Sequence, residues 1–246
     1  MEKEISFILK DDKVRLKIYE NGRKGPVILY VTMPHSTENT KVIFDNLSGR
    51  LKNDFVLAEL TVKDWDRFLT PWPVADCMKN RNFTGEGSSL LTVITGDALP
   101  YIEQVYPEHG SFYIAGYSLA GLFSLWAFYE EECFKGAASA SGSLWYPGWT
   151  KYCQGKSINS DKDPLIYLSL GDRESKSRNP LMKQVLDATE LQYQIFRDND
   201  RIRSTFKMEQ GGHFDDVDSR IANAVEWLLT EDKNIYDKSN RLQPNI

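Results

Sequence analysis

The stretch SFYIAGYSLAG, residues 111–121, decides the fold predicted for this chain. Its first half, 111–115, is an apolar run typical of a short buried strand, and 119–129 has the pattern of an apolar helix. Ser118 stands at the corner between the two, where a tight turn projects a side chain above a sheet. The arrangement indicates a nucleophilic serine at a strand-to-helix turn.

Small residues flank this serine on both sides. A strained turn of this kind is crowded, so it needs small residues two positions before and two positions after the nucleophile. Gly116 and Ala120 meet this need, although the strict pattern has glycine at the second of these positions. The alternative is that Ser118 only caps the following helix. The strand before it and the helix after it favour the nucleophile.

Strand and helix patterns alternate along the rest of the chain. Strands are expected over 4–9, 14–19, 27–33, 55–60, 111–115, 135–140, 165–170 and 202–208, and helices over about 36–51, 88–106, 119–129, 181–197 and 216–229. An antiparallel start followed by repeated strand–helix units predicts an α/β fold, with a mostly parallel central sheet and helices on both faces. We expect one domain over 1–246, with long irregular loops at 61–87 and 144–160.

Composition excludes several classes of function. The formal net charge is −5 and no run of Lys or Arg suggests a nucleic-acid surface. No apolar stretch approaches the roughly 20 residues that span a bilayer, and the N-terminus lacks the pattern of a signal peptide. The three cysteines are scattered, without metal-ligand spacing. We therefore expect a cytoplasmic protein without cofactor, metal, nucleic-acid or membrane partner; its oligomeric state is not readable.

Only three histidines are available as the general base for a serine nucleophile. His109 precedes a predicted strand, at the sheet edge opposite Ser118. His35 and His213 each follow a strand, on the same edge as Ser118. In α/β-hydrolases the chain order is serine, acid, histidine, and only His213 follows Ser118. We assign His213 as the base and His35 to the pocket or oxyanion loop.

Two carboxylates compete for the role of the acid that orients the histidine. The strand at 165–170 lies between the serine and the histidine in the chain and is followed by GDRE, 171–174. Many hydrolases of this fold place the acid three residues after such a glycine, which favours Glu174. Asp172 is the rival, and one of the two is expected to be a solvated turn carboxylate.

The oxyanion hole needs two backbone N–H groups. One is expected from Leu119, the residue after the nucleophile. The other is expected from the loop after the strand at 27–33, where Pro34 has no N–H and the candidates are Met33 and His35.

Aromatic residues are concentrated in the two long loops that follow strands, and these loops are expected to overhang the nucleophile. They can bind an apolar or aromatic part of a substrate, or they can simply pack the loops onto the sheet. The candidates for substrate binding are Trp65, Trp72, Trp145 and Trp149, together with Tyr117 beside the nucleophile.

With these residues in hand, the chain resembles the putative-esterase family, which includes esterase D-like enzymes, enterochelin esterase-like siderophore hydrolases and feruloyl esterases. The matching segments are GYSLAGL at 116–122, SASGSLWYP at 139–147, GDRE at 171–174, GHF at 212–214 and WDRFLTPWP at 65–73. The resemblance implies an α/β-hydrolase fold, metal-independent ester hydrolysis and an acyl-enzyme intermediate. Some members of the family are acyltransferases.

These observations favour a serine carboxylic-ester hydrolase that acts on a small or medium ester. An acyltransferase would use the same triad with an acceptor alcohol in place of water. A catalytically inactive binding protein of the same fold is the third possibility. Feruloyl, acetyl-sugar, siderophore and simple acyl esters all remain open as substrates.

Overall fold

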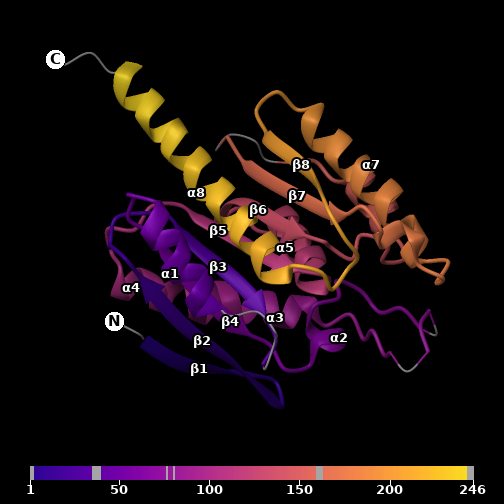
Figure 1. The fold of residues 1–246 in the computed structure, drawn as a ribbon. Helices are drawn as coiled ribbons and strands as arrows, with labels where there is room; N and C mark the ends of the chain where they lie inside the picture. The colour runs from indigo at the N-terminus through magenta and orange to yellow at the C-terminus, as the bar shows by residue number, and fades with distance from the viewer. Residues whose placement is uncertain (1–2, 35–39, 76, 80, 159–162, 243–246) are drawn as a thin grey trace.

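The computed structural model describes residues 3–34, 40–75, 77–79, 81–158 and 163–242. Eight strands form one sheet in the order β1-β2-β4-β3-β5-β6-β7-β8 (Figure 1). Their bounds are β1 Lys3–Leu9, β2 Asp12–Glu20, β3 Val27–Thr32, β4 Val56–Thr61, β5 Phe112–Tyr117, β6 Phe134–Ala140, β7 Leu165–Gly171 and β8 Arg203–Glu209. Pairs β1–β2 and β2–β4 are antiparallel and the remaining pairs are parallel, which confirms the predicted fold class.

Helices cover both faces of the sheet. They are α1 Thr40–Arg50, α2 Trp65–Phe68, α3 Gly87–Val93, α4 Leu99–Val105, α5 Leu119–Glu130, α6 Trp149–Gly155, α7 Val185–Arg197 and α8 Val217–Leu242. One apolar cluster packs α3, α4, α5 and α7 against one face. A second cluster packs α1 and α8 against the other. Strands β3, β5 and β7 are buried along their whole length because they are covered on both sides.

The chain reverses direction across the sheet beside β3. It passes from β3 through α1 to β4 on one side, and then returns through α3 and α4 to β5 on the other side. In open sheets of this type, ligands bind beyond the carboxyl ends of the strands at such a reversal. The carboxyl ends of β3 and β5, and of β7 and β8 further along, therefore mark the edge where a site is expected.

The structure differs from the sequence-based expectation in the loops and at helix ends. The interval 144–160 contains helix α6, which starts after Gly148 in the left-handed conformation (φ 90°) and buries Trp149 and Cys153 four residues apart. The interval 61–87 contains α2. Helix α8 continues thirteen residues beyond the predicted end at 229, and Ile235 in this extension packs against the second apolar cluster.

Two further differences concern helices whose existence was predicted. The helix expected over 88–106 is interrupted by a π-helical turn at Ile94–Ala98, between α3 and α4. The expected helix start near residue 36 lies outside the described residues, and α1 is described from Thr40. No helix in the described part of the chain is long and apolar enough to cross a membrane.

Candidate active site

Ser118 occupies a strained turn between β5 and α5. Its φ of 58° lies in the left-handed region that a non-glycine residue rarely adopts. The turn brings the chain so close to itself that a Cβ on Gly116 would lie 2.4 Å from the backbone of Ala120. Glycine is therefore required at 116, while a methyl group is accommodated at 120.

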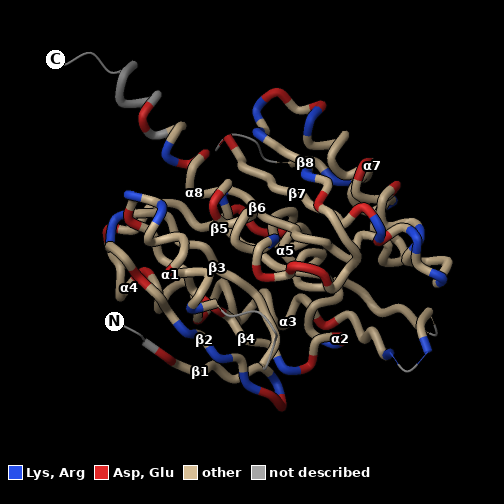
Figure 2. The backbone as a smooth tube through the Cα atoms, in the orientation of Figure 1, with Lys and Arg blue, Asp and Glu red and all other residues tan. Residues whose placement is uncertain are grey.

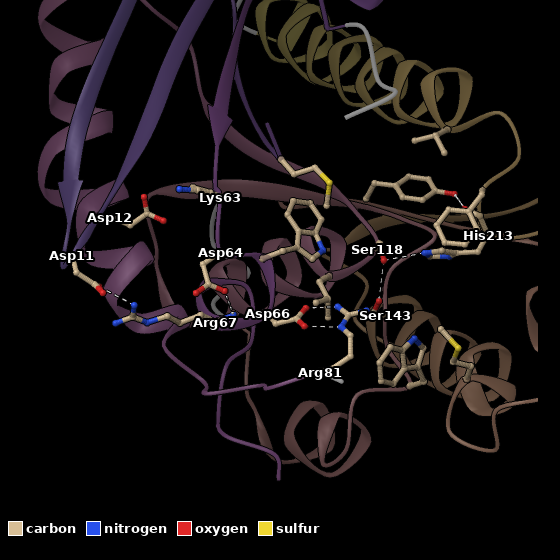
Figure 3. Close-up of a pocket in the computed structure, with 18 residues that line it drawn as sticks. Asp11, Asp12, Lys63, Asp64, Asp66, Arg67, Arg81, Ser118, Ser143 and His213 are labelled. Atoms are coloured by element: carbon tan, nitrogen blue, oxygen red, sulfur yellow. Dashed lines mark hydrogen bonds and ion pairs between the residues drawn. The ribbon is translucent and has the colours of Figure 1, made fainter. Parts of the chain in front are cut away.

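His213 contacts the serine from the loop that follows β8. Its Nε2 lies 2.9 Å from Ser118 Oγ, and its Nδ1 lies 2.7 Å from Glu174 Oε2 (Figure 3). The structure thus brings Ser118, His213 and Glu174 into one hydrogen-bonded line, although they are 95 and 39 residues apart along the chain. This geometry is suited to withdrawal of the hydroxyl proton by the imidazole.

The structure places Glu174, and not Asp172, against the imidazole. Glu174 is 8% exposed, and its Oε1 accepts a hydrogen bond from the Gly171 N–H at 2.7 Å. Asp172 is exposed, and its carboxylate accepts a hydrogen bond from the Gly211 N–H at 2.9 Å. Asp172 therefore fastens the loop that carries His213 without touching the ring.

The environment of Glu174 favours its charged form. Burial raises the pKa of the Glu174 carboxyl. Its hydrogen bond and charge interaction with His213, together with the hydrogen bond from Gly171, lower that pKa by more than burial raises it. The net result is a pKa below the ordinary value of a glutamate. A carboxylate is thus available at neutral pH to hold the imidazole and to stabilise the imidazolium.

Two residues next to the nucleophile complete its surroundings. The Tyr117 hydroxyl donates to the backbone carbonyl of His213 at 2.6 Å, and the two rings lie 5.4 Å apart. Ser143, on the loop after β6, places its Oγ 3.3 Å from Ser118 Oγ, and its N–H donates to the Ser118 carbonyl at 2.9 Å (Figure 3). Ser143 was not identified from the sequence, although it lies within the matched segment at 139–147.

Arg220 was also missed. It lies in the first turns of α8, is 1% exposed and donates from Nη1 to Glu174 Oε1 at 3.0 Å. Nothing in the local sequence marks it, because a single arginine at a helix start is usually solvated. Only the packing of α8 across the carboxyl ends of the strands brings it to the acid.

A cavity of about 1000 Å³ opens onto Ser118. Its lining combines apolar and charged side chains, and Figure 3 shows Asp11, Asp12 and Lys63 on the side away from Ser118, with Asp66 and Arg81 drawn between them and the nucleophile. The apolar part includes Met33, Leu119, Trp145, Met182, Phe214 and Val217, and the charged part includes Asp11, Asp12, Lys63, Asp64, Asp66, Arg67 and Arg81. The cavity therefore offers both apolar and charged surface to a ligand.

Much of the charged lining comes from the place where the tip of the β1–β2 hairpin meets α2, and both signs of charge occur at this tip (Figure 2). Arg67 donates to Asp11 and to Glu86, both at 2.8 Å. Arg81 makes a two-pronged contact with Asp66. Both arginines are therefore matched by carboxylates.

The aromatic candidates divide into two groups. Tyr117, Trp65 and Trp145 line the cavity. Trp149 is fully buried, and Trp72 donates its indole N–H to the Pro147 carbonyl at 2.8 Å; neither lines the cavity. For these two residues the packing alternative describes the structure: Trp72 fastens the loop before α3 to the loop after β6, and Trp149 packs against Tyr129 of α5.

The candidates for the oxyanion hole lie at two strand ends. Leu119 is the first residue of α5, so its N–H has no partner within the helix. Met33 directly follows β3 and lines the cavity. His35 lies outside the described residues. His109 lies before β5, at the opposite edge, where its ring contacts Phe112. In the described ranges, no group of three His, Cys, Asp or Glu side chains could hold a metal ion.

Comparison with solved structures supports the fold. The siderophore hydrolase EstA from Aspergillus nidulans superposes with a TM-score of 0.73 at 18% identity, covering 94% of each chain. An IroE-like serine hydrolase from Shewanella oneidensis gives 0.73 at 13% identity, over 94% of this chain and 81% of that one. Enterochelin esterase from Shigella flexneri gives 0.71 at 18% identity, over 92% of this chain and 57% of that one.

Comparison of sequences gives a family. The family model described as "Putative esterase" matches residues 11–217. No curated protein matches the chain. The matched range runs from the β1–β2 turn to the start of α8 and so includes Ser118, Glu174 and His213.

Proposed function

This chain belongs to the "Putative esterase" family and is a serine ester hydrolase, and we propose that it acts through a Ser118–His213–Glu174 triad and an acyl-enzyme intermediate. The observation that carries the proposal is the pair of contacts made by one imidazole, 2.9 Å to Ser118 Oγ and 2.7 Å to Glu174 Oε2. A serine hydroxyl needs such a base to become a nucleophile at neutral pH.

In the first half of the reaction, Ser118 Oγ attacks the ester carbonyl carbon while His213 Nε2 takes the hydroxyl proton. The negative charge that develops on the carbonyl oxygen is stabilised by backbone N–H groups, for which Leu119 and Met33 are the candidates. The tetrahedral intermediate then collapses, the alcohol leaves with the proton from His213, and the acyl group stays on Ser118.

In the second half, water takes the place of the alcohol. His213 removes a proton from the water, which attacks the acyl carbon, and Ser118 recovers its proton as the acid leaves. Throughout, Glu174 holds the ring by its Nδ1 and balances the charge of the imidazolium. An acceptor alcohol in place of water would give acyl transfer instead of hydrolysis, and product analysis separates the two.

The cavity fits an ester of small to medium size that carries both apolar and polar groups. Its lining includes apolar side chains beside the triad, such as Leu119 and Phe214, together with charged side chains of the β1–β2 hairpin and α2. Arg67 and Arg81 are already paired with carboxylates, so their two charges are balanced within the protein. A siderophore ester is one candidate, since two proteins of similar structure are a siderophore hydrolase and an enterochelin esterase.

A direct test compares the wild type with Ser118→Ala on p-nitrophenyl esters from acetate to decanoate and on a catecholate or hydroxamate siderophore ester. We expect hydrolysis by the wild type and a loss of at least about 10⁴-fold in kcat for the variant. Activity that survives in the variant would contradict the proposal. Transfer products formed with added alcohols would assign the acyltransferase reaction instead.

A further inference from the structure

Arg220 carries a charge deep inside the molecule, directly behind the catalytic acid. Its side chain is 2% exposed and that of Glu174 is 4% exposed. A lone ion buried to this extent is strongly unfavourable, so each of the two charges depends on the other. The first turn of α8 fixes the arginine, since the Arg220 N–H donates to the Asp216 carbonyl at 3.0 Å.

The guanidinium connects the elements that carry the triad. Nη1 lies 3.0 Å from Glu174 Oε1, 2.8 Å from Ser141 Oγ and 3.2 Å from the Tyr117 hydroxyl. Nη2 donates to the Gln210 carbonyl at 3.1 Å, in the loop that leads to His213. One side chain of α8 thus contacts the ends of β5, β6, β7 and β8.

The two oxygens of Glu174 have separate tasks. Oε2 faces His213 Nδ1, whereas Oε1 accepts from Arg220 and from the Gly171 N–H. We propose that Arg220 is a positioning residue that turns Oε2 toward His213 and sets the pH below which the triad takes up a proton and stops working. This inference rests on the triad of the proposed function.

The sign of the pH effect follows from charge counting. In the active state the Glu174 carboxylate and the Arg220 guanidinium cancel, and His213 is neutral. One added proton makes the cluster positive. Without Arg220 the active state has a net negative charge, and the same proton neutralises it, which is easier inside the protein. Loss of the cation therefore moves the low-pH limb of the activity profile to higher pH.

Other charged groups near the cluster are more exposed or already paired. Arg173 pairs with Asp215 at 2.9 Å, with side chains 59% and 50% exposed. Asp172 and Lys176 are exposed, and Asp172 is bonded to the Gly211 N–H. Three further titratable groups interact with the charge of Arg220, namely Tyr117, Tyr167 and Asp215, and Glu209 lies beside Tyr167. Within the described residues, Arg220 is the buried cation in contact with Glu174.

The test is the pH dependence of kcat/KM for Arg220→Met, Arg220→Lys and Arg173→Met. Arg220→Met is expected to move the low-pH limb upward by about 1 pH unit and to lower kcat at the plateau. Arg220→Lys keeps the charge and is expected to leave the limb in place. Arg173→Met removes a charge of the same size from an exposed side chain. Because solvent screens that charge, this variant is also expected to leave the limb in place.

A limb that stays in place for Arg220→Met, with activity reduced equally at every pH, would overturn the inference, because a merely structural role gives that result. Ser118→Ala is assayed in parallel. If it retains activity, the triad itself is wrong; if it is inactive while the limb of Arg220→Met does not move, only the role of Arg220 is wrong.

A measurement of unfolding keeps the inference testable if Arg220→Met does not fold. Glu174→Gln leaves the guanidinium without its buried partner, so the double variant Glu174→Gln/Arg220→Met is expected to have a higher melting temperature than Glu174→Gln alone. A double variant that melts at or below the temperature of Glu174→Gln would contradict the pairing.

Discussion

The Tyr117 hydroxyl donates a hydrogen bond to the backbone carbonyl of His213 at 2.6 Å, so the residue before the nucleophile fastens the loop that carries the base. Tyr117 is 5% exposed, and burial raises the pKa of its hydroxyl, which keeps it a donor. The end of β5 therefore leads directly into the nucleophile Ser118 and also holds the loop of the base His213.

Replacing this tyrosine tests the contact. Tyr117→Phe is expected to lower kcat by about fivefold, because the lost hydrogen bond contributes about 1 kcal/mol to holding the loop that carries His213. The matched control is Tyr113→Phe on the same strand, whose hydroxyl donates to Asp232 at 2.5 Å. It is expected to lower the melting temperature and leave kcat unchanged. Equal kcat losses in both variants would contradict the positional role of Tyr117.

The identity of the triad acid gives a second prediction. Glu174→Gln is expected to lower kcat by about 10³-fold to 10⁴-fold, since an amide cannot balance the imidazolium. Asp172→Asn keeps an oxygen that can accept from Gly211 N–H and is expected to change kcat by less than about threefold. Steady-state kinetics on one ester checks both, and a large loss in Asp172→Asn would contradict the assignment.

The ion pairs of Glu86, which join the loop before α3 to Lys10 at the tip of the β1–β2 hairpin and to Arg67 of α2, give a pH-dependent prediction. Hydrogen bonds from Arg67 and Lys10 lower the pKa of Glu86 to about 2, from an ordinary value of 4.5. Because the folded-state pKa is depressed, Glu86 contributes stability above about pH 4.5, and this contribution disappears as the pH falls toward 2. Urea unfolding across this window is expected to show a shallower pH dependence for Glu86→Gln. An unchanged slope would contradict the contribution.

The aromatic wall of the cavity gives a prediction about specificity. Trp65 lines the cavity and Trp72 does not. Trp65→Ala is expected to raise KM several-fold for long or bulky esters while changing little for an acetyl ester. Trp72→Phe removes the bond to Pro147 and is expected to lower the melting temperature and leave KM unchanged. The KM values of both variants across a chain-length series measure the difference, and a KM change confined to Trp72→Phe would contradict it.

Much of the site was predictable because its signals are local. Ser118 is marked by an apolar strand, small neighbours and an apolar helix, and His213 by its place after the last strand and after the serine. The choice between Glu174 and Asp172 could only be ranked, because two residues of one turn differ in burial for reasons that lie in the packing around them. The strands of the sheet were predictable because each is also marked by a local signal, a short run of apolar residues.

What the sequence did not reveal depends on contacts between distant segments. Arg220 is 46 residues from Glu174, and its burial results from the way α8 crosses the strand ends. The residues around Trp149 have a composition typical of a loop, yet Trp149 lies in helix α6 and is one of its buried residues. Side chains of the same type thus line the cavity at Trp65 and fill the core at Trp149.

The most direct test of the account is covalent labelling of the nucleophile. The intact mass of the wild type is measured after reaction with a fluorophosphonate, and the labelled peptide is then mapped. We expect one adduct, on Ser118, with no adduct in Ser118→Ala and much slower labelling in His213→Ala, because both need the activated hydroxyl. An adduct on another residue, or labelling that persists in Ser118→Ala, would contradict the central claim.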